Sequence, residues 1–166
     1  MEALYRIARE ALSNAVTGAP AAHYPWTQLE SGETQMQGIN WLAVVAAAVS
    51  SFVLGGLWFG PLFGKAWLRA SGVTEEMVAN ANMARTLGVS FVLQLIIAGV
   101  LAAFIGPEAT FGFAVAAASA AGLFWVAPAF AVVYLFEQRS FGHWAINGGY
   151  QIVAFTLMGV ILGLWR

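Results

Sequence analysis

Four long stretches of this chain contain no charged residue, and their length limits what the chain can fold into. They cover about residues 39–59, 86–105, 111–136 and 144–165. An α-helix rises about 1.5 Å per residue, so about 20 apolar residues cross a hydrocarbon core of about 30 Å. The sequence therefore predicts an all-α integral membrane bundle of four transmembrane helices.

The composition excludes several other classes of protein. Hydrophobic residues make up 60% of the chain and charged residues 9%, whereas a soluble domain carries about 25% charged residues. The formal net charge of -1 provides no broad basic surface, so we expect no nucleic-acid partner. Cysteine is absent, which excludes disulfides, thiolate metal sites and a thiol nucleophile. We expect no cofactor.

The first 35 residues differ from the rest of the chain. Their part Leu4–Val16 weakly resembles the first box of the ATP-binding domain of sensor histidine kinases. That family reads adenine through an aspartate-glycine box, and this chain has no aspartate, so the resemblance implies a non-functional fragment. We expect residues 1–35 to be a disordered or mis-started extension outside the bundle, and residues 36–166 to be the membrane domain. The alternative is a short surface helix followed by a flexible linker.

An elbow at the membrane surface is predicted after the first stretch, beginning with a turn at Gly60-Pro61. Helical spacing places Phe63 and Trp67 on one face and Lys65 and Arg69 on the opposite face. Such a short interfacial helix buries its rings at the acyl boundary while its cations reach lipid phosphate. The predicted interfacial anchor consists of Trp58, Phe63, Lys65, Trp67 and Arg69.

A further helix is predicted to begin at Thr74. Its hydroxyl is a suitable N-cap, and Glu75 and Glu76 follow in the first turn, where the helix dipole favours carboxylates. We expect this helix to run through Asn80 and Asn82 into the second uncharged stretch. Gly106-Pro107 then ends it, which predicts a hairpin with the third span.

The distribution of cations predicts an orientation. Loops 60–85 and 137–143 share one side of the membrane and carry most of the Lys and Arg residues near the spans. The positive-inside rule places these loops in the cytoplasm and both termini outside. The lipid bilayer is the first partner expected of such a protein.

Neutral polar residues inside the spans form a possible binding pocket. Ionisable residues within a membrane mark functional sites, but the spans have none away from their ends. The possible polar pocket consists of Gln94, Asn147, Tyr150 and Gln151. It fits a small neutral molecule, and the alternative is hydrogen bonding between helices.

Small residues recur at four-residue spacing in the spans. Such spacing lets two helix backbones approach closely in lipid, either within one bundle or between chains. The predicted helix-packing residues are Gly56, Gly60, Gly64, Ala114, Ala118, Gly122, Gly159 and Gly163. Pro128 is expected to kink the third span, with neighbouring helices satisfying the carbonyl that it frees.

The third loop is the place where acid, base and imidazole come together, at Glu137, Arg139 and His143. A surface catalytic site is one interpretation, and an exposed ion pair beside an interfacial histidine is the other. One histidine provides too few ligands for a metal site, so we expect no metal.

Residues Ile39–Arg166 resemble a bacterial family of four-helix membrane proteins catalogued as domain of unknown function 1761. The pattern tryptophan-aromatic-x-proline, followed by Phe-Gly-Lys-x-Trp, is matched between Trp58 and Trp67. The pattern asparagine-x-glycine-tyrosine is matched by Asn147, Gly149 and Tyr150. The family often has tyrosine-serine where this chain has Phe59-Gly60. The resemblance implies a fold and a location in a bacterial inner membrane, and no reaction.

Three functions remain open from the sequence. The first is a non-enzymatic structural or interaction protein that forms a homo-oligomer or assists another membrane protein. The second is a carrier or channel for a small neutral or lipid-like molecule. The third is a membrane-surface enzyme that uses Glu137 and His143. We expect the first, because the small-residue seams are present and buried charge is absent.

Overall fold

A computed structural model of the chain describes residues 38–165. The predicted N-terminal extension 1–35, with its segment Leu4–Val16, and Arg166 lie outside the described residues. The helices of the described part are α3 (Trp41–Leu57), α4 (Gly64–Ser71), α5 (Glu75–Ala79), α6 (Met83–Ile105), α7 (Phe111–Ala120), α8 (Ala127–Phe136) and α9 (Phe141–Leu164), with π-helices η1 (Trp58–Leu62) and η2 (Ala121–Val126).

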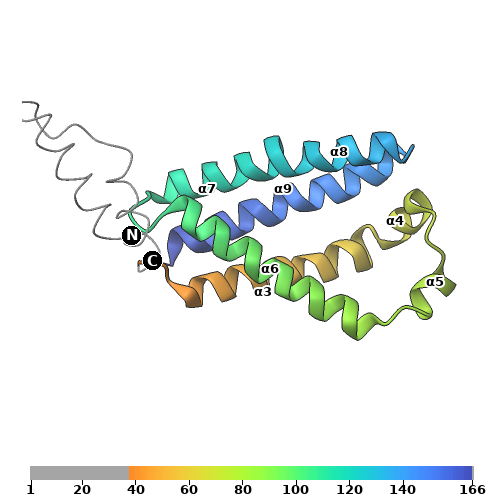
Figure 1. The fold of residues 1–166 in the computed structure, drawn as a ribbon, viewed down its shortest axis with the longest axis horizontal. Coiled ribbons are helices and arrows are strands. Elements are labelled where there is room, and N and C mark those ends of the chain that lie inside the picture. Colours follow the sequence, from red (N-terminus) through yellow and green to blue (C-terminus); the bar gives the residue numbers. More distant parts are fainter. Residues whose placement is uncertain (1–37, 166) are drawn as a thin grey trace, which may run out of the picture. The chain divides into compact units, whose positions relative to one another are not determined.

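The protein is an all-α bundle with four helices long and apolar enough to cross a membrane. These spans are Trp41–Leu62, Met83–Ile105, Phe111–Phe136 and Phe141–Leu164. Helix α9 is central: it packs along α7, η2 and α8 and also along α3 (Figure 1). Helix α6 packs mainly on α3 and touches α7 less extensively. The prediction of a four-helix membrane bundle is thus confirmed.

Side-chain caps define where the helices begin. Asn40, Thr74, Asn82, Thr110 and Ser140 each accept a hydrogen bond from a backbone N–H in the first turn of the following helix. Such bonds satisfy donors that lack an intrahelical partner. Because Ser140 is the cap of α9, this helix starts at residue 141, three residues before the predicted span.

One predicted detail of the elbow is wrong. The first span does not turn at Gly60-Pro61 but continues through π-helix η1, and the helical path is interrupted at Phe63, with φ -121° and ψ 2°. Pro61 lies within the first turn of the π-helix η1, where its missing N–H removes few backbone hydrogen bonds. Helical turns therefore continue past it. A short helix, α4, follows and ends at Gly72, where a φ of 74° favours glycine.

The predicted continuous helix from Thr74 into the second span is also wrong. Helix α5 ends at Ala79, and α6 begins afresh at Met83. Asn82 Oδ1 accepts a hydrogen bond from Arg85 N over 3.0 Å. Asparagine competes for backbone donors in this way, which favours a cap over a position inside a helix.

The third span contains a π-helix immediately before its proline. Segment η2 precedes Pro128, whose missing N–H prevents regular α-helical bonding at that turn. Trp144 Nε1 of α9 donates to the carbonyl of Ala127 over 2.9 Å. A neighbouring helix therefore supplies a donor to the irregular turn.

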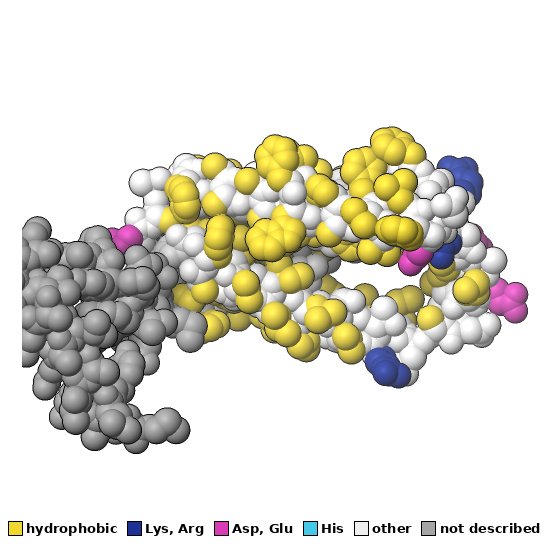
Figure 2. All heavy atoms as spheres, turned by 45° about the horizontal axis from the view of Figure 1, so that its top comes forward, with side chains coloured by type: hydrophobic (Ala, Val, Ile, Leu, Met, Phe, Trp, Pro, Cys, Tyr) yellow, Lys and Arg dark blue, Asp and Glu magenta, His cyan; other side chains and the backbone are white. Residues whose placement is uncertain are grey.

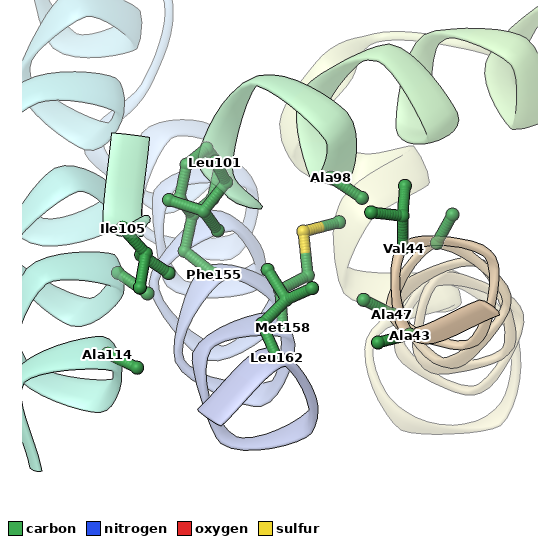
Figure 3. Packing of buried hydrophobic residues seen from close by; sticks show 12 residues of the cluster. Ala43, Val44, Ala47, Ala98, Leu101, Ile105, Ala114, Phe155, Met158 and Leu162 are labelled. Atoms are coloured by element: carbon green, nitrogen blue, oxygen red, sulfur yellow. The ribbon is translucent and has the colours of Figure 1, made fainter. Parts of the chain in front are cut away.

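Small residues let the helices approach in the core (Figure 3). Met158 of α9 is fully buried and lies between α9 and α3. The same core cluster contains alanines of α3, α6 and α7, whose small side chains let the helix backbones approach closely. The core cluster consists of Ala43, Val44, Ala47, Ala48, Ala98, Leu101, Ile105, Ala114, Ala118, Phe155, Met158 and Leu162.

Large apolar side chains cover the outside of the bundle, and charge is confined to its ends (Figure 2). Leu42, Val100, Phe104 and Leu135 are among the exposed apolar residues. In water such a surface would be costly, but in a bilayer it faces hydrocarbon. The outer surface thus has the polarity expected of a membrane bundle.

Candidate functional site

Three polar side chains join α3, α6 and α9 midway along their spans, and we call them the midspan cluster (Ser51, Gln94 and Tyr150). Ser51 Oγ donates to Gln94 Oε1 over 3.2 Å, and Gln94 Nε2 donates to Tyr150 OH over 3.0 Å. Tyr150 OH donates to the backbone carbonyl of Ser51 over 3.2 Å. Ser51 and Tyr150 are buried. This closed set of bonds satisfies polar groups at a depth that water does not reach.

A second set of polar side chains, the elbow cluster (Trp67, Tyr134 and Asn147), fastens α4 to the bundle. Trp67 Nε1 donates to Asn147 Oδ1 over 3.2 Å. Asn147 Nδ2 donates to Tyr134 OH over 3.0 Å. These residues belong to α4, α8 and α9. The oxygen and the nitrogen of the Asn147 amide therefore hold three helices together.

Further contacts dock the elbow on α9. Trp58 Nε1 donates to the carbonyl of Ile146 over 3.0 Å, and its ring centroid lies 4.7 Å from that of Phe63. Arg139 Nη1 donates to the carbonyl of Ser71 over 3.0 Å. The elbow, which runs from Trp58 to Ser71, is therefore attached to the bundle at both of its ends.

The structure places three of the four residues of the predicted polar pocket in these two clusters. Gln94 and Tyr150 lie in the midspan cluster, and Asn147 lies in the elbow cluster. Gln151, although only four residues from Asn147, makes no side-chain hydrogen bond with any described residue. Sequence reasoning did not identify Ser51, whose position near the middle of the first uncharged stretch was a usable signal.

The predicted interfacial anchor also divides into two groups. Lys65 and Arg69 are exposed, while Trp58 and Trp67 are partly buried against other helices. The indole N–H groups explain the difference, because each donates to an oxygen of α9. A tryptophan at this depth is held by protein when an acceptor is within reach.

His143 and Glu137 have different surroundings. The imidazole of His143 is 8% exposed, and its ring centroid lies 4.6 Å from that of Tyr134 in an edge-on arrangement. Its Nδ1 is buried without a hydrogen-bond partner. Glu137 pairs instead with Arg139, at 3.3 Å, on the exposed surface. The described residues thus contain no hydrogen bond that would activate His143.

The small residues of α7 and α9 form a close contact inside the bundle. A Cβ added to Gly159 would lie 2.5 Å from the Cβ of Ala118 and 2.9 Å from the carbonyl oxygen of Ala114. A Cβ added to Gly163 would lie 3.1 Å from the Cβ of Ala114, and one added to Gly122 would lie 3.0 Å from the Cβ of Phe155.

The glycines at the end of the first span have different surroundings. Gly56 and Gly60 are exposed, and a Cβ added to either would meet nothing within 4 Å. A Cβ added to Gly64 would lie 2.6 Å from the carbonyl oxygen of Phe59, within the elbow itself. Gly56 and Gly60 therefore face away from the rest of the bundle.

Comparison with known proteins identifies a family but no activity. The family model described as "Protein of unknown function (DUF1761)" matches residues 42–163. No curated protein and no solved structure matches the chain. Among the described residues, no group of three or more His, Cys, Asp or Glu side chains is placed to hold a metal ion.

Proposed function

This chain belongs to the DUF1761 family, and we propose that it is a non-enzymatic protein of a bacterial inner membrane that self-associates through the outer face of α3 and η1. The observation that supports this proposal is the position of Gly56 and Gly60. They are spaced by four residues, lie on the surface of the bundle, and have no described atom above them. In lipid, paired glycines at this spacing allow a second helix to approach closely.

The rest of the same α3 face is apolar and regular. Val45, Val49 and Val53 are exposed, while Ala43, Ala47 and Ser51 on the opposite side are buried. Branched side chains beside two glycines form the ridge and groove that an identical helix can match across a two-fold axis. A second copy of this chain is therefore the partner we propose.

The two polar clusters favour packing over transport of a small neutral molecule. Each cluster satisfies its amide within the protein, and a ligand would have to displace these bonds. Hydrogen bonds between transmembrane helices contribute about 0.6 kcal/mol each on average. We therefore assign the midspan and elbow clusters to holding the bundle together.

A surface enzyme built on Glu137 and His143 has less support. The Glu137 carboxylate is paired with Arg139, and the His143 ring is covered by its neighbours. No described residue forms a hydrogen bond with Nδ1 of this imidazole, so no second side chain orients the ring as a base.

The proposed orientation places the elbow in the cytoplasm. Lys65, Arg69 and Arg139 lie in the two connections at that end of the bundle, and Arg85 lies in the first turn of α6. The positive-inside rule favours cytoplasmic loops with such cations. Both ends of the chain then lie outside.

The oligomeric state of a glycine variant tests the proposal. We expect the wild-type chain in lipid nanodiscs to contain two copies per disc, measured by single-molecule photobleaching. The double substitution Gly56→Leu with Gly60→Leu is expected to weaken self-association about tenfold or more, because each leucine holds the second helix away.

Gly88→Leu is the matched control. Gly88 lies on α6, is exposed, and likewise has no atom within 4 Å of an added Cβ. We expect this variant to associate like the wild type. A wild-type chain that is monomeric at every protein-to-lipid ratio, or a double variant that associates normally, would contradict the proposal.

A further inference from the structure

A groove that opens toward the surrounding membrane separates α6 from α7 and η2. Its volume is about 800 Å³, and all thirteen residues that line it are hydrophobic. Val100 and Phe104 form part of one wall, Ala117 and Ala120 part of the other, and Phe155 of α9 also lines it. The groove exists because α6 packs along α3 and touches α7 only in part.

Measured along the helix axes, the groove is about as long as one leaflet of a bilayer is thick. Its lining runs from Ile96 to Phe104 on α6 and from Phe113 to Val126 on the third span. At about 1.5 Å per residue, these segments measure roughly 12 and 20 Å, close to half of a hydrocarbon core of about 30 Å. In a bilayer this groove would face hydrocarbon, which fits an occupant with a long apolar chain.

Trp125 provides a second observation. It lines the groove, lies near the middle of the span Phe111–Phe136, and is 75% exposed. Its indole N–H makes no hydrogen bond with any described residue. Trp58, Trp67 and Trp144 differ, because each donates to a protein oxygen. A donor without an acceptor in hydrocarbon costs free energy.

We propose that the groove binds one uncharged lipid-like molecule that combines a long apolar chain with a carbonyl group, the chemical class of isoprenoid quinones. The chain lies between α6 and α7, and the carbonyl accepts a hydrogen bond from Trp125 Nε1. The charged headgroup of a phospholipid is too costly to bring to this depth, and its ester carbonyls lie near the membrane surface. An uncharged ring carbonyl can reach Trp125.

This inference concerns a different surface from the proposed self-association. The α3 face with Gly56 and Gly60 carries none of the residues that line the groove. Failure of one proposal therefore leaves the other unaffected, and oligomeric state and ligand binding are measured separately.

Binding of a quinone with a ten-carbon chain, decylubiquinone, tests the inference. We expect the detergent-purified full chain to bind one molecule, detected as a mass shift in native mass spectrometry and titrated by calorimetry. Trp125→Phe keeps the aromatic ring and removes the donor, and should weaken binding about tenfold. Trp41→Phe, at an exposed tryptophan outside the groove, should bind normally.

A second pair of variants tests the position of the chain. Ala120→Trp is expected to fill the groove and abolish binding. Ala116→Trp adds the same ring to an exposed position of α7 that does not line the groove, and should leave binding unchanged. Because both alanines are partly or fully exposed, thermal unfolding should show both variants folded.

Two results would overturn the inference. One is decylubiquinone binding that is equal in the wild type, Trp125→Phe and Ala120→Trp. The other is equal binding of decylbenzene, which has the same chain and no carbonyl, because the proposed hydrogen bond would then contribute nothing.

Discussion

The hydroxyl of Tyr150 donates a hydrogen bond to the backbone carbonyl of Ser51 over 3.2 Å, and this bond joins the centre of α9 to the centre of α3. The same hydroxyl accepts a hydrogen bond from Gln94. Gly55 of α3 lies against the Tyr150 ring, with 3.3 Å between an added Cβ and the hydroxyl oxygen. The contact therefore combines a small residue with a polar pair at mid-depth.

Tyr150→Phe is expected to lower the free energy of unfolding by about 1 kcal/mol. The substitution keeps the ring and removes the oxygen that forms hydrogen bonds with both Gln94 and Ser51. The measurement is reversible unfolding in mixed micelles with increasing denaturing detergent. Gln151→Leu is the matched control, since Gln151 makes no side-chain hydrogen bond with a described residue and its loss should change stability little. Equal effects of the two substitutions would contradict the role of the midspan cluster.

Gly159→Ala should destabilise the bundle by about 1–3 kcal/mol, the usual cost of overpacking. The new methyl group would lie 2.5 Å from Ala118 Cβ and 2.9 Å from the carbonyl oxygen of Ala114, so α7 would have to move. Thermal unfolding measures the effect. Gly88→Ala, where the added Cβ has open space, should be neutral or slightly stabilising, because alanine is the better helix former. A neutral Gly159→Ala would show that α7 and α9 do not pack this closely.

Trp67→Phe should loosen the elbow while leaving the spans intact. It removes the hydrogen bond to Asn147, so we expect amide hydrogen exchange in residues 64–71 to become about three- to tenfold faster. Exchange measured by mass spectrometry on the reconstituted protein tests this. Lys65→Gln, at an exposed elbow position, should leave exchange unchanged. If the two variants exchange alike, the bond does not hold α4 in place.

Single cysteines test the proposed orientation, because the chain has no cysteine of its own. Met77→Cys lies on α5, and Glu108→Cys lies in the connection between α6 and α7; both positions are exposed. With the elbow in the cytoplasm, an impermeant maleimide should label Glu108→Cys in spheroplasts with intact inner membranes. It should label Met77→Cys only after permeabilisation. The reverse pattern would place the elbow outside.

Much of the fold could be predicted from the sequence, because membrane spans depend on local composition. The uncharged stretches 86–105 and 111–136 end at the same residues as the structural spans Met83–Ile105 and Phe111–Phe136. The second span ends at Gly106, the C-cap of α6, where the pair Gly106-Pro107 predicted its end. The break between α5 and α6 was harder to predict, because Asn82 acts as a cap only when its amide turns back to Arg85 N.

The site depended far more on contacts between distant segments. Helical spacing places Asn147 and Gln151 on one face, yet Asn147 alone meets partners, on α4 and α8. Spacing likewise does not distinguish Gly56 from Gly159. A Cβ added to Gly56 has open space around it, whereas Gly159 lies against α7. The neighbours of a residue depend on which helices pack together.

Apolar length and the absence of charge decide whether a helix can span a bilayer, so the amino-acid sequence was enough to predict a membrane bundle of four helices. Helix packing set the role of each polar or small residue. It brought Gln94 and Tyr150 together with Ser51, turned Trp67 toward α9, and left Trp125 in the wall of a groove. In lipid, every helix is apolar outside, so hydrophobic pattern does not specify which faces meet. Close packing and interhelical hydrogen bonds make that choice, and both depend on residues far apart in the chain.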